Sequence, residues 1–438
     1  MDTKSNIKKT IAIIDGGGRA HALVKKYRQS KKVSRIIAIP GNDLILLEKN
    51  TRIFPKTKTT DVAEIIKICT QEKVELVDIA QDDAVAAGLT DALLKKGFKV
   101  FGPTKSAGQI EWDKSWSRIF MKKFNIPHPA FKICKSQKEG IDFLKKQKNS
   151  YWWVKASGLA AGKGALLARN NKEAIEKIRE MKNFGKSGKT FLIEENLEGE
   201  EFSSFAIVNG KNFKLLGHAQ DHKTVFDGNL GPNTGGMGCS SPPLAINPKV
   251  EKQIKVILKK TIKGLAMLKR PYTGILYLGG IIDKRDNVSV IEFNARWGDP
   301  EAQVILPSIK NDYMNMVEKA LEGKIPEVKK DKLYRVVVAG ASKGYPQDHS
   351  QAVGKDIQGL EKIPKISLFG AGVKKEKGKY IASGGRLIYA LGEGRNVREA
   401  RKKAYNLLSL VTIAGDNLHY RTDIGYRDLK RILPHNTA

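Results

Sequence analysis

The segment Val290–Gln303 reads VIEFNARWGDPEAQ, and it sets the interpretation of the rest of the chain. Its first residues are apolar and strand-forming, so Glu292, Asn294 and Arg296 are expected on one face by the period of two. A carboxylate and an amide oxygen two residues apart form a compact oxygen site for a hard cation such as Mg²⁺. Arg296 adds a planar fork that suits a carboxylate or a phosphate. The alternative interpretation is a charged edge strand that ends in an ordinary turn.

The size and composition of the chain indicate a globular α/β protein. Its 438 residues predict three domains on the prior of about 150 residues each. No run approaches the roughly 18 apolar residues that span a bilayer, and the opening MDTKSNIKKT shows no secretory cleavage pattern. The scattered cysteines Cys69, Cys134 and Cys239 indicate neither a disulfide framework nor a zinc cluster. These features predict a soluble cytoplasmic protein.

The formal net charge of +32 makes nucleic acid the first partner to consider. The lysines, however, are spread over predicted helix faces, as at Lys145, Lys146 and Lys148, and do not gather in one tail. A polyanionic substrate or a general richness in lysine explains the charge equally well. We therefore do not expect specific nucleic-acid binding.

Near the N-terminus, an apolar run at Thr10–Ile14 leads into a glycine turn and then an apparent helix. The turn reads Gly16, Gly17, Gly18, Arg19, and a strand, glycine turn and helix in this order direct backbone N–H groups at a phosphate. The spacing is not G-x-G-x-x-G, so a tight turn of any doubly wound domain is the alternative. Further strands alternate with helices, which predicts a parallel sheet covered on both faces. The strands are expected at 36–39, 76–80 and 99–101, and the helices at 62–70 and 84–95.

The middle of the chain contains a glycine-rich loop that follows a strand ending in Lys155. A helix over 106–124, which carries Lys114, precedes this strand. The loop has glycines at 158, 162 and 164 and a lysine at 163, a composition that suits a mobile flap over a triphosphate. It is not a Walker A loop, because no Ser or Thr follows the lysine and no helix begins there.

Two polar segments follow this loop. A strand at 191–193 leads into Glu194 and Glu195, where the alternatives are a nucleotide-binding edge and an exposed acidic turn. Residues 221–238 then run from Asp221-His222-Lys223 to a glycine-rich stretch that suits backbone packed against a small substrate. His222 is a candidate metal ligand or base, although a single loop histidine more often only forms a hydrogen bond.

Several segments together resemble the ATP-grasp superfamily and, within it, the phosphoribosylamine–glycine ligase family of purine biosynthesis. The resemblance runs in order along nearly the whole chain, and the last two segments are the most specific. The segments are GGGRAHAL at 16–23, FGPTKSAGQIEWDKSWSRIFM at 101–121, VKASGLAAGKG at 154–164, IEENLEGEEFS at 193–203, AQDHKTVFDGNLGPNTGGMG at 219–238 and IEFNARWGDPEAQ at 291–303.

The resemblance implies an α/β protein in three parts. These are an N-terminal Rossmann-like (pre-ATP-grasp) domain over 1–103, a central ATP-grasp domain over 104–328 with a mobile lid at about 126–194, and a small mixed C-terminal domain over 329–438. The implied reaction joins glycine to 5-phosphoribosylamine with cleavage of ATP to ADP and phosphate. The implied partners are these small molecules, not a membrane or nucleic acid, and the implied assembly is a monomer or weak homodimer.

The resemblance also implies a role for each motif. Glu292 and Asn294 hold Mg²⁺ or Mn²⁺ on the phosphates of ATP. Catalysis falls to Arg296, which holds the glycine carboxylate or its phosphate, and to Asp221 and Lys223. ATP is bound by Lys114, Lys155, Gly162, Lys163, Gly164, Glu194, Glu195, Leu197 and Glu201, with the adenine at the strand end and the ribose at Glu201. The remaining substrate-binding residues fall into two groups. Gly16, Gly17, Gly18 and Arg19 receive the ribose 5-phosphate, and the loop residues Asn233, Thr234, Gly235 and Gly236 form the floor of the substrate site together with Asp221 and Lys223.

Three positions depart from the family pattern. Ala20 replaces a glutamate, Ser157 replaces an aspartate, and Gln81–Asp83 replace Gly-Pro-Glu. Two of the three lie in the first domain, so a changed amine substrate is the first alternative. A ligase for another acid is a second, and a basic nucleic-acid-binding protein on a decayed ATP-grasp scaffold is a third. The presence of Glu292, Asn294, Arg296 and Lys155 argues against decay.

Overall fold

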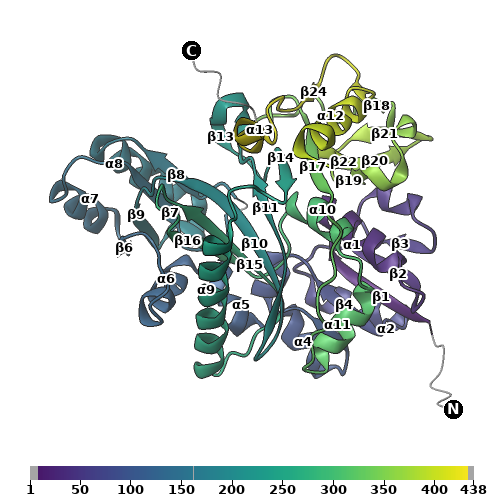
Figure 1. Cartoon of the computed structure of the whole chain (residues 1–438), viewed down its shortest axis with the longest axis horizontal. Helices are drawn as coiled ribbons and strands as arrows, with labels where there is room; N and C mark the ends of the chain where they lie inside the picture. The colour runs from purple at the N-terminus through teal and green to yellow at the C-terminus, as the bar shows by residue number, and fades with distance from the viewer. Residues whose placement is uncertain (1–7, 161, 433–438) are drawn as a thin grey trace.

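The computed structural model describes residues 8–160 and 162–432 of the chain. Residues 1–7, part of the segment used to judge the N-terminus, and Ala161 of the glycine-rich loop lie outside the described residues. Figure 1 shows the purple N-terminal sheet at the right, the teal strands of the central region in the middle and at the left, and the yellow C-terminal elements above.

The N-terminal region is a five-stranded parallel sheet in the order β3-β2-β1-β4-β5. The middle of its central strand β1, residues 11–14, is apolar and fully buried, as a strand covered on both faces requires. The strand order reverses between β1 and β4, and the loops that follow these strands therefore form the crevice where such sheets bind ligands. The strands are β1 (Lys9–Asp15), β2 (Val33–Pro40), β3 (Thr51–Ile53), β4 (Leu76–Ile79) and β5 (Lys99–Phe101). The helical segments are α1 (Gly18–Arg28), η1 (Asp43–Leu47), α2 (Val62–Gln71), α3 (Asp82–Ala87) and α4 (Leu89–Lys95).

Two helices that the sequence predicts as continuous are broken. The predicted helix 84–95 is interrupted at Gly88, whose backbone is left-handed with φ of +84°. The predicted helix 106–124 divides into α5 (Lys105–Trp112) and α6 (Lys114–Lys123). Asp113 lies between them in extended conformation, and its carboxylate caps α6 by accepting from the N–H of Trp116 at 3.1 Å.

A second, smaller sheet holds the predicted lid. It is antiparallel in the order β6-β9-β7-β8, and the glycine-rich loop joins β7 to β8 as the predicted hairpin. Two helices pack with it, and it projects to the left in Figure 1. Its elements are β6 (Phe131–Cys134), α7 (Gln137–Lys145), β7 (Trp152–Ala156), β8 (Ala165–Ala168), α8 (Asn171–Glu180), η2 (Met181–Gly188) and β9 (Phe191–Glu195).

The largest sheet is antiparallel and continues from the central region into the C-terminal region. Its order is β16-β15-β10-β11-β14-β17-β22-β19, with β24 paired to β17, and the junction is the pairing of β14 with β17. Its strands are β10 (Glu200–Asn209), β11 (Phe213–Asp221), β14 (Gly238–Ser241), β15 (Thr273–Ile282), β16 (Val288–Asn294), β17 (Tyr334–Ser342), β19 (Leu368–Gly370), β22 (Arg386–Gly394) and β24 (Leu418–His419).

The remaining elements surround this sheet. The hairpin β12 (Thr224–Phe226) and β13 (Leu230–Asn233) lies within the predicted substrate segment. A four-stranded sheet joins β20 (Val373–Glu376), β21 (Lys379–Ala382), β18 (Asp356–Gln358) and β23 (Thr412–Ile413). The larger helices are α9 (Pro248–Met267), α11 (Tyr313–Leu321) and α12 (Val397–Leu408), and the shorter ones are α10 (Glu301–Ile305) and α13 (Tyr426–Ile432). Short 3₁₀ segments lie at 227–229, 306–308, 360–362 and 365–367.

One core joins the N-terminal sheet to the large sheet. Fully buried aromatic side chains from α1, β10, the turn after β16, α11 and β22 belong to a single hydrophobic cluster: Tyr27, Phe205, Trp297, Tyr313 and Tyr389. Close packing of such a cluster fixes the glycine turn after β1 relative to the end of β16. Within residues 8–160 and 162–432, no helix has both the length and the apolar character needed to cross a membrane.

Candidate active site

The predicted oxygen site lies at the end of β16. Glu292 faces Gly279 on the neighbouring strand β15, and a Cβ at that glycine would lie 3.4 Å from the Glu292 side chain. Burial alone would raise the pKa of the Glu292 carboxyl, but Lys223, Lys114 and other cations lower it below its usual value. Glu292 is therefore an ionised carboxylate surrounded by positive charge.

Asn294 completes this site. Its side chain is 6% exposed, its Oδ1 accepts from Arg296 Nη2 at 3.2 Å, and its Nδ2 has no hydrogen-bond partner among the described residues. A buried amide nitrogen without a partner is unusual in a folded protein and is expected where a bound ligand completes the hydrogen bonds. The predicted proximity of Glu292, Asn294 and Arg296 is thus present in the structure.

Arg296 is held by a glutamate that the sequence analysis missed. Its Nη2 lies 2.8 Å from Glu111 Oε1 and 3.9 Å from Asp82 Oδ2, and its Nη1 donates to the Trp297 carbonyl at 3.2 Å. Glu111 also accepts from the Ala295 N–H at 2.7 Å, and burial raises its pKa to about 7 against the opposing charge of Arg296. The Nε of Arg296 is buried and has no partner within the described chain. The guanidinium is therefore oriented, with one donor left for another group.

The predicted phosphate-binding Lys155 lies in a buried ion cluster. Its Nζ is 2.7 Å from Glu194 Oε2, and Arg118 contacts the same carboxylate at 2.6 Å and 2.9 Å. Burial alone would raise the pKa of the Glu194 carboxyl, but Lys155 and Arg118 outweigh it and lower that pKa from 4.5 to about 2. Glu194 therefore directs its side chain into the protein, which leaves only its backbone for the predicted contact with adenine.

Ser157 connects Lys114 to the end of β7. Its Oγ donates to Asp113 Oδ1 at 3.0 Å and accepts from the Ser115 N–H at 3.0 Å, while its carbonyl accepts from the Lys114 N–H at 2.8 Å. Ser157, where the family usually has an aspartate, therefore contacts the start of α6 and fixes the backbone that carries Lys114.

The tip of the glycine-rich loop reaches the C-terminal region. Lys163 Nζ donates to the Pro346 carbonyl at 3.2 Å. Gly162 has a left-handed φ of +75°, and a Cβ there would lie 3.8 Å from the Thr234 carbonyl oxygen. The Gly164 carbonyl accepts a hydrogen bond from the Ala156 N–H at 2.8 Å, which closes the hairpin. In this structure the loop therefore lies over the predicted substrate segment.

Glu201, Asp221 and Lys223 line one small cavity between β10, β11 and β15. Lys223 Nζ lies 3.1 Å from Glu201 Oε2, and Glu201 and Glu292 raise the pKa of this ammonium against the effect of burial. Burial and the neighbouring Glu301 raise the pKa of Asp221 well above its usual value. The other predicted ATP residues, Glu195 and Leu197, lie at the end of β9 and in the connection to β10.

The predicted substrate loop is pinned at both ends. Thr234 donates twice to the Lys223 carbonyl, through its N–H and its Oγ1, each at 2.7 Å. Gly235 donates its N–H to Tyr345 at 3.1 Å, and Gly236 has a left-handed φ of +115° that brings its backbone against Asp221. Asn233 is the last residue of β13.

His222 forms a hydrogen bond, as a single loop histidine more often does. Its Nε2 accepts from the Gly425 N–H at 3.3 Å, and its ring meets Tyr426 edge to face. Burial lowers the pKa of its imidazole to about 3, so the ring is neutral near pH 7. Arg421, fully buried, donates to Thr224 in the same contact region. The C-terminal segment therefore packs on the predicted substrate segment.

The glycine turn at 16–18 begins helix α1 as predicted, with Gly17 as its N-cap. Arg19 differs from expectation, because its guanidinium is 5% exposed and already paired. It contacts Asp15 Oδ2 at 3.0 Å and the Trp297 carbonyl at 2.8 Å, and it also donates to Gln81. Arg19 would reach a substrate phosphate only by leaving these partners. The other departures lie nearby: Ala20 is buried in α1, and Asp83 accepts from Thr59.

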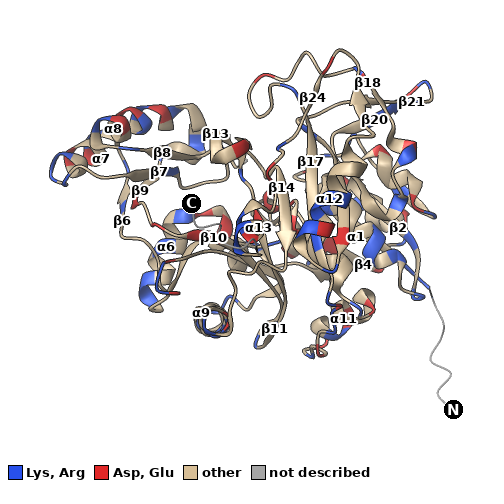
Figure 2. Cartoon of the chain, turned by 45° about the horizontal axis from the view of Figure 1, so that its top comes forward, with Lys and Arg blue, Asp and Glu red and all other residues tan. Residues whose placement is uncertain are grey.

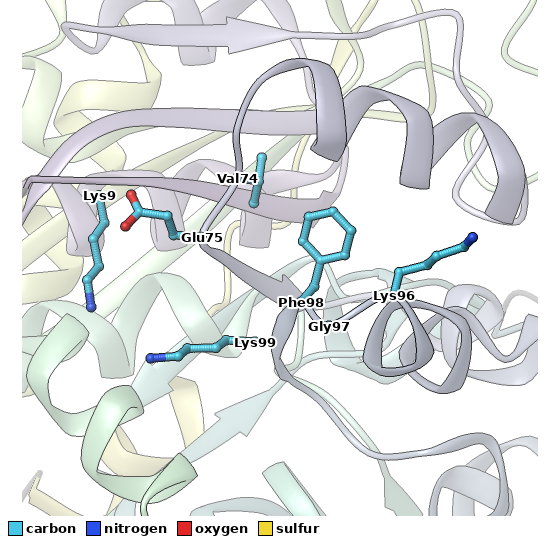
Figure 3. Close-up of a pocket in the computed structure, with 7 residues that line it drawn as sticks. All are labelled: Lys9, Val74, Glu75, Lys96, Gly97, Phe98 and Lys99. Atoms are coloured by element: carbon cyan, nitrogen blue, oxygen red, sulfur yellow. The ribbon is translucent and has the colours of Figure 1, made fainter.

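A larger depression lies at the opposite edge of the N-terminal sheet. It has a volume of about 400 Å³ and is lined by the first residues of β1 and β5 and the turns before β4 and β5, including Lys9, Glu75, Phe98 and Lys99 (Figure 3). It lies at the amino ends of the strands, whereas ligands of such sheets bind at the carboxyl ends. The predicted site residues are all elsewhere.

Lysines and arginines are distributed over all parts of the chain, as Figure 2 shows. Among the described residues, no group of three or more His, Cys, Asp and Glu side chains is arranged to hold a metal ion. A cation at Glu292 and Asn294 would therefore need further oxygen ligands from a substrate or from water.

The Glu194 cluster gives a stability prediction. Glu194→Gln leaves two cations buried without their counter-charge, which costs about 3–5 kcal/mol of the free energy of unfolding. Because the native pKa of about 2 lies below 4.5, this stabilisation is present above pH 4.5 and is lost as the pH falls toward 2. Urea unfolding at several pH values measures both effects.

Glu139→Gln is the matched control, because Glu139 pairs with Lys132 at 2.9 Å on the exposed surface of the same small sheet. Its effect on the free energy of unfolding should be much smaller. Equal losses in the two variants would contradict a stabilising role for the buried cluster.

Comparison with known proteins gives three family matches in sequence order. The models are the N domain of phosphoribosylglycinamide synthetase over residues 9–111, its ATP-grasp (A) domain over 112–302 and its C domain over 335–427. The three domain models of phosphoribosylglycinamide synthetase therefore all match this chain, in order and without overlap.

Individual relatives extend over almost the full length. The phosphoribosylamine–glycine ligase of Halalkalibacterium halodurans is 38% identical over 420 residues, which cover 95% of this chain and 96% of the relative. The crystal structure of phosphoribosylamine–glycine ligase from Thermotoga maritima is 31% identical with a TM-score of 0.80, covering 94% of this chain and 99% of that one. A biotin carboxylase from Campylobacter jejuni shares the fold at 15% identity, with a TM-score of 0.71 and coverage of 96% and 98%.

Proposed function

The chain belongs to the phosphoribosylglycinamide synthetase family, and we propose from this membership that its site ligates glycine to 5-phosphoribosylamine through a glycyl phosphate. The enzyme is an ATP-dependent ligase that forms a C–N bond in purine biosynthesis and yields glycinamide ribonucleotide, ADP and phosphate. One observation supports this assignment most strongly. Glu292, Asn294 and Arg296 lie in the same site as Lys223 and Asp221, in a chain that is related to these ligases over 95% of its length.

The chemistry requires ATP because a carboxylate is a poor electrophile. One oxygen of the glycine carboxylate attacks the γ-phosphorus of ATP, ADP leaves, and glycyl phosphate forms. The amine nitrogen of the ribosylamine then attacks the acyl carbon, and phosphate leaves with the original carboxylate oxygen. Such phosphoryl transfer depends mainly on positioning and charge neutralisation.

The nucleotide site is proposed to lie between the small lid sheet and β16. Lys155, Lys163 and Lys114 face the phosphate oxygens, and the loop glycines 162 and 164 allow the backbone to close over them. The backbone at Glu194, Glu195 and Leu197 borders the adenine, and Glu201 accepts from the ribose hydroxyls. Lys155 is already paired with Glu194 at 2.7 Å, so the bound phosphate shares its charge with this carboxylate.

The acid and amine substrates are assigned to the other side of β16. Arg296, oriented by Glu111, has a free Nε to hold the glycine carboxylate and the acyl phosphate. Asp221, whose pKa is raised by burial, is proposed to take the proton that the amine loses, and Lys223 is proposed to neutralise the developing charge. Backbone at 233–236 forms the floor, and the glycine turn at 16–18 with Arg19 borders the ribose 5-phosphate.

The residues at the end of β16 fit a divalent cation. Glu292 supplies an ionised carboxylate and Asn294 a buried amide oxygen, and these are the hard oxygen donors that Mg²⁺ or Mn²⁺ prefers. When bound there, such a cation supplies neutralisation of the phosphate charge. We propose that Mg²⁺ or Mn²⁺ serves, with phosphate oxygens and water as the remaining ligands.

We also propose the domain bounds, the cellular location and the assembly state from the family membership. The domains are taken as 1–103, 104–328 and 329–438, with the small sheet within 126–194 as the lid that moves. The enzyme is proposed to act in the cytoplasm, as a monomer or weak homodimer, on small molecules alone. Nucleic acid is not proposed as a partner, since the lysines and arginines are dispersed over all parts of the chain (Figure 2).

A substrate panel tests the proposal, with ADP release as the readout and phosphoribosylamine generated in place. ADP release should require both glycine and the ribosylamine. Alanine should be poorer by about 100-fold, because its methyl group would shift the reacting carboxylate by about 1 Å. Faster turnover with another amine or acid would identify a different ATP-grasp ligase. No ADP with any pair would favour a binding protein on this scaffold.

A further inference from the structure

Arg386, at the start of β22, contacts two site loops that come from distant parts of the chain. Its Nη1 donates to the carbonyls of Gly235 at 2.6 Å and Gly236 at 3.2 Å. The same nitrogen donates to the Asp299 carbonyl at 2.6 Å, and Nη2 contacts Asp299 Oδ2 at 3.1 Å. One guanidinium thus joins the substrate loop to the turn that follows the Glu292–Arg296 site.

These contacts bring negative groups together. Three carbonyl oxygens and one carboxylate converge on the Arg386 guanidinium, and its side chain is 17% exposed. Without a cation between them, the oxygen dipoles of the two loops would repel in a region that water reaches poorly. The conformation of Gly235 and Gly236 therefore depends on the several contacts that this one guanidinium makes.

Asp299 extends the connection to the N-terminal region. Its Oδ1 accepts from Gln303 Nε2 at 2.6 Å, and a Cβ at Gly17 would lie 2.9 Å from its Oδ2. Gly18 packs closely against Gln303, the residue that donates to Asp299, since a Cβ at Gly18 would lie 2.5 Å from Gln303 Nε2. The carboxylate thus fixes the distance between the glycine turn and the substrate loop.

We propose that Arg386 is a positioning residue for the amine substrate, holding the Gly235–Gly236 loop and Asp299 in register with the glycine turn at 16–18. This inference rests on the proposed function for the identity of the amine. Arg386 contacts the loop proposed as the substrate floor and Asp299, which lies against the glycine turn assigned to the ribose 5-phosphate. Lys114, Lys155 and Glu194 of the nucleotide site are not among its contacts. Through Arg386, the C-terminal region therefore helps to position the amine substrate.

The test compares Arg386→Lys with a matched control, Arg335→Lys. Lysine keeps the charge but cannot make the fork of contacts. Arg335 is 2% exposed on β17 of the same sheet and pairs with Asp331 at 2.7 Å and Glu393 at 2.6 Å, away from the substrate loop. It is an arginine that is still more buried than Arg386 and has no contact with the substrate loop.

Two readouts separate positioning from general stability. In Arg386→Lys, the KM for phosphoribosylamine should rise about 10- to 100-fold, the range for lost charged hydrogen bonds, while the KM for ATP stays within about twofold. Amide hydrogen exchange at 233–238 in the ligand-free enzyme should become about tenfold faster or more, as expected of a loop that opens locally. Arg335→Lys should change neither quantity. Asp299→Asn, which removes the carboxylate from the other side, should reproduce both changes.

Unchanged exchange at 233–238 in Arg386→Lys would overturn the proposal, because a residue that only touches substrate leaves the free loop as it was. Equal rises in the KM values for ATP and the amine would overturn it as well. A wild-type enzyme that releases no ADP with glycine and ribosylamine would instead contradict the proposed function, and the exchange measurement would still decide the role of Arg386.

Discussion

Replacing Glu292 by alanine is expected to lower the rate of ADP formation about 1,000-fold or more, since metal-assisted charge stabilisation contributes several kcal/mol. Glu292 provides the single carboxylate of the oxygen site, and Asn294 alone offers one neutral oxygen. The lysines nearby would remain, so the protein loses its cation but keeps its affinity for anions. Steady-state ADP release at ordinary Mg²⁺ concentrations, with circular dichroism to verify the fold, measures the effect.

Two comparisons make this result specific. Glu176→Ala removes an exposed carboxylate on α8 and should leave the rate unchanged. Asn294→Asp retains an oxygen ligand and should lose much less activity than Glu292→Ala. Removal of divalent cations with a chelator should abolish ADP release in the wild type, and Mg²⁺ or Mn²⁺ should restore it. Full activity of Glu292→Ala would remove the metal assignment.

The second large effect is expected at Arg296. Arg296→Lys should raise the half-saturating concentration of glycine about 100-fold, which corresponds to about 3 kcal/mol from lost charged hydrogen bonds. Lysine cannot make the contacts with Glu111 and the Trp297 carbonyl and still present a second donor to the substrate. The measurement is the KM for glycine and for ATP in the same assay, and the KM for ATP should change little.

Glu111→Gln gives the graded comparison. It leaves Arg296 in place but removes the carboxylate at 2.8 Å that orients it, so its effect on the KM for glycine should be smaller, about tenfold. A change in the KM for ATP larger than that for glycine, in either variant, would show that Arg296 serves the nucleotide instead of the acid.

Most of the structural features that the sequence predicted correctly follow from patterns within a few residues. The alternation in Val290–Gln303 placed Glu292 and Asn294 on one face of β16, because the period of a strand is fixed by its backbone. The glycine turn at 16–18 begins α1, and the loop after Lys155 is a hairpin, since glycine and strand signals act within a few residues. In each case the information lies within one segment.

The remaining features depend on contacts between distant segments. Helix continuation is overridden at two positions, by the left-handed backbone of Gly88 and by the side-chain cap that Asp113 forms. Glu194 pairs with Arg118 across 76 residues, and Arg386 pairs with Asp299 across 87. Burial of a charge requires such a partner, but composition does not reveal which one.

Arg19 illustrates the same limit. An arginine after three glycines suggests a phosphate ligand, yet its guanidinium is buried against Asp15. Asp15 lies four residues before Arg19, a spacing that suits an ion pair, so this partner could have been inferred from the sequence. Gln81 and Asp82, which meet Arg19 and Arg296, connect the departures from the family pattern to the site.

The central claim is that ATP activates the carboxylate of glycine. The most direct measurement uses glycine with ¹⁸O in both carboxylate oxygens, together with ATP, Mg²⁺ and phosphoribosylamine, and analyses the products by mass spectrometry. The account predicts one ¹⁸O in the released phosphate for each turnover, one ¹⁸O in the amide carbonyl of glycinamide ribonucleotide, and none in ADP. Phosphate without ¹⁸O, while the amide product still forms, would contradict it.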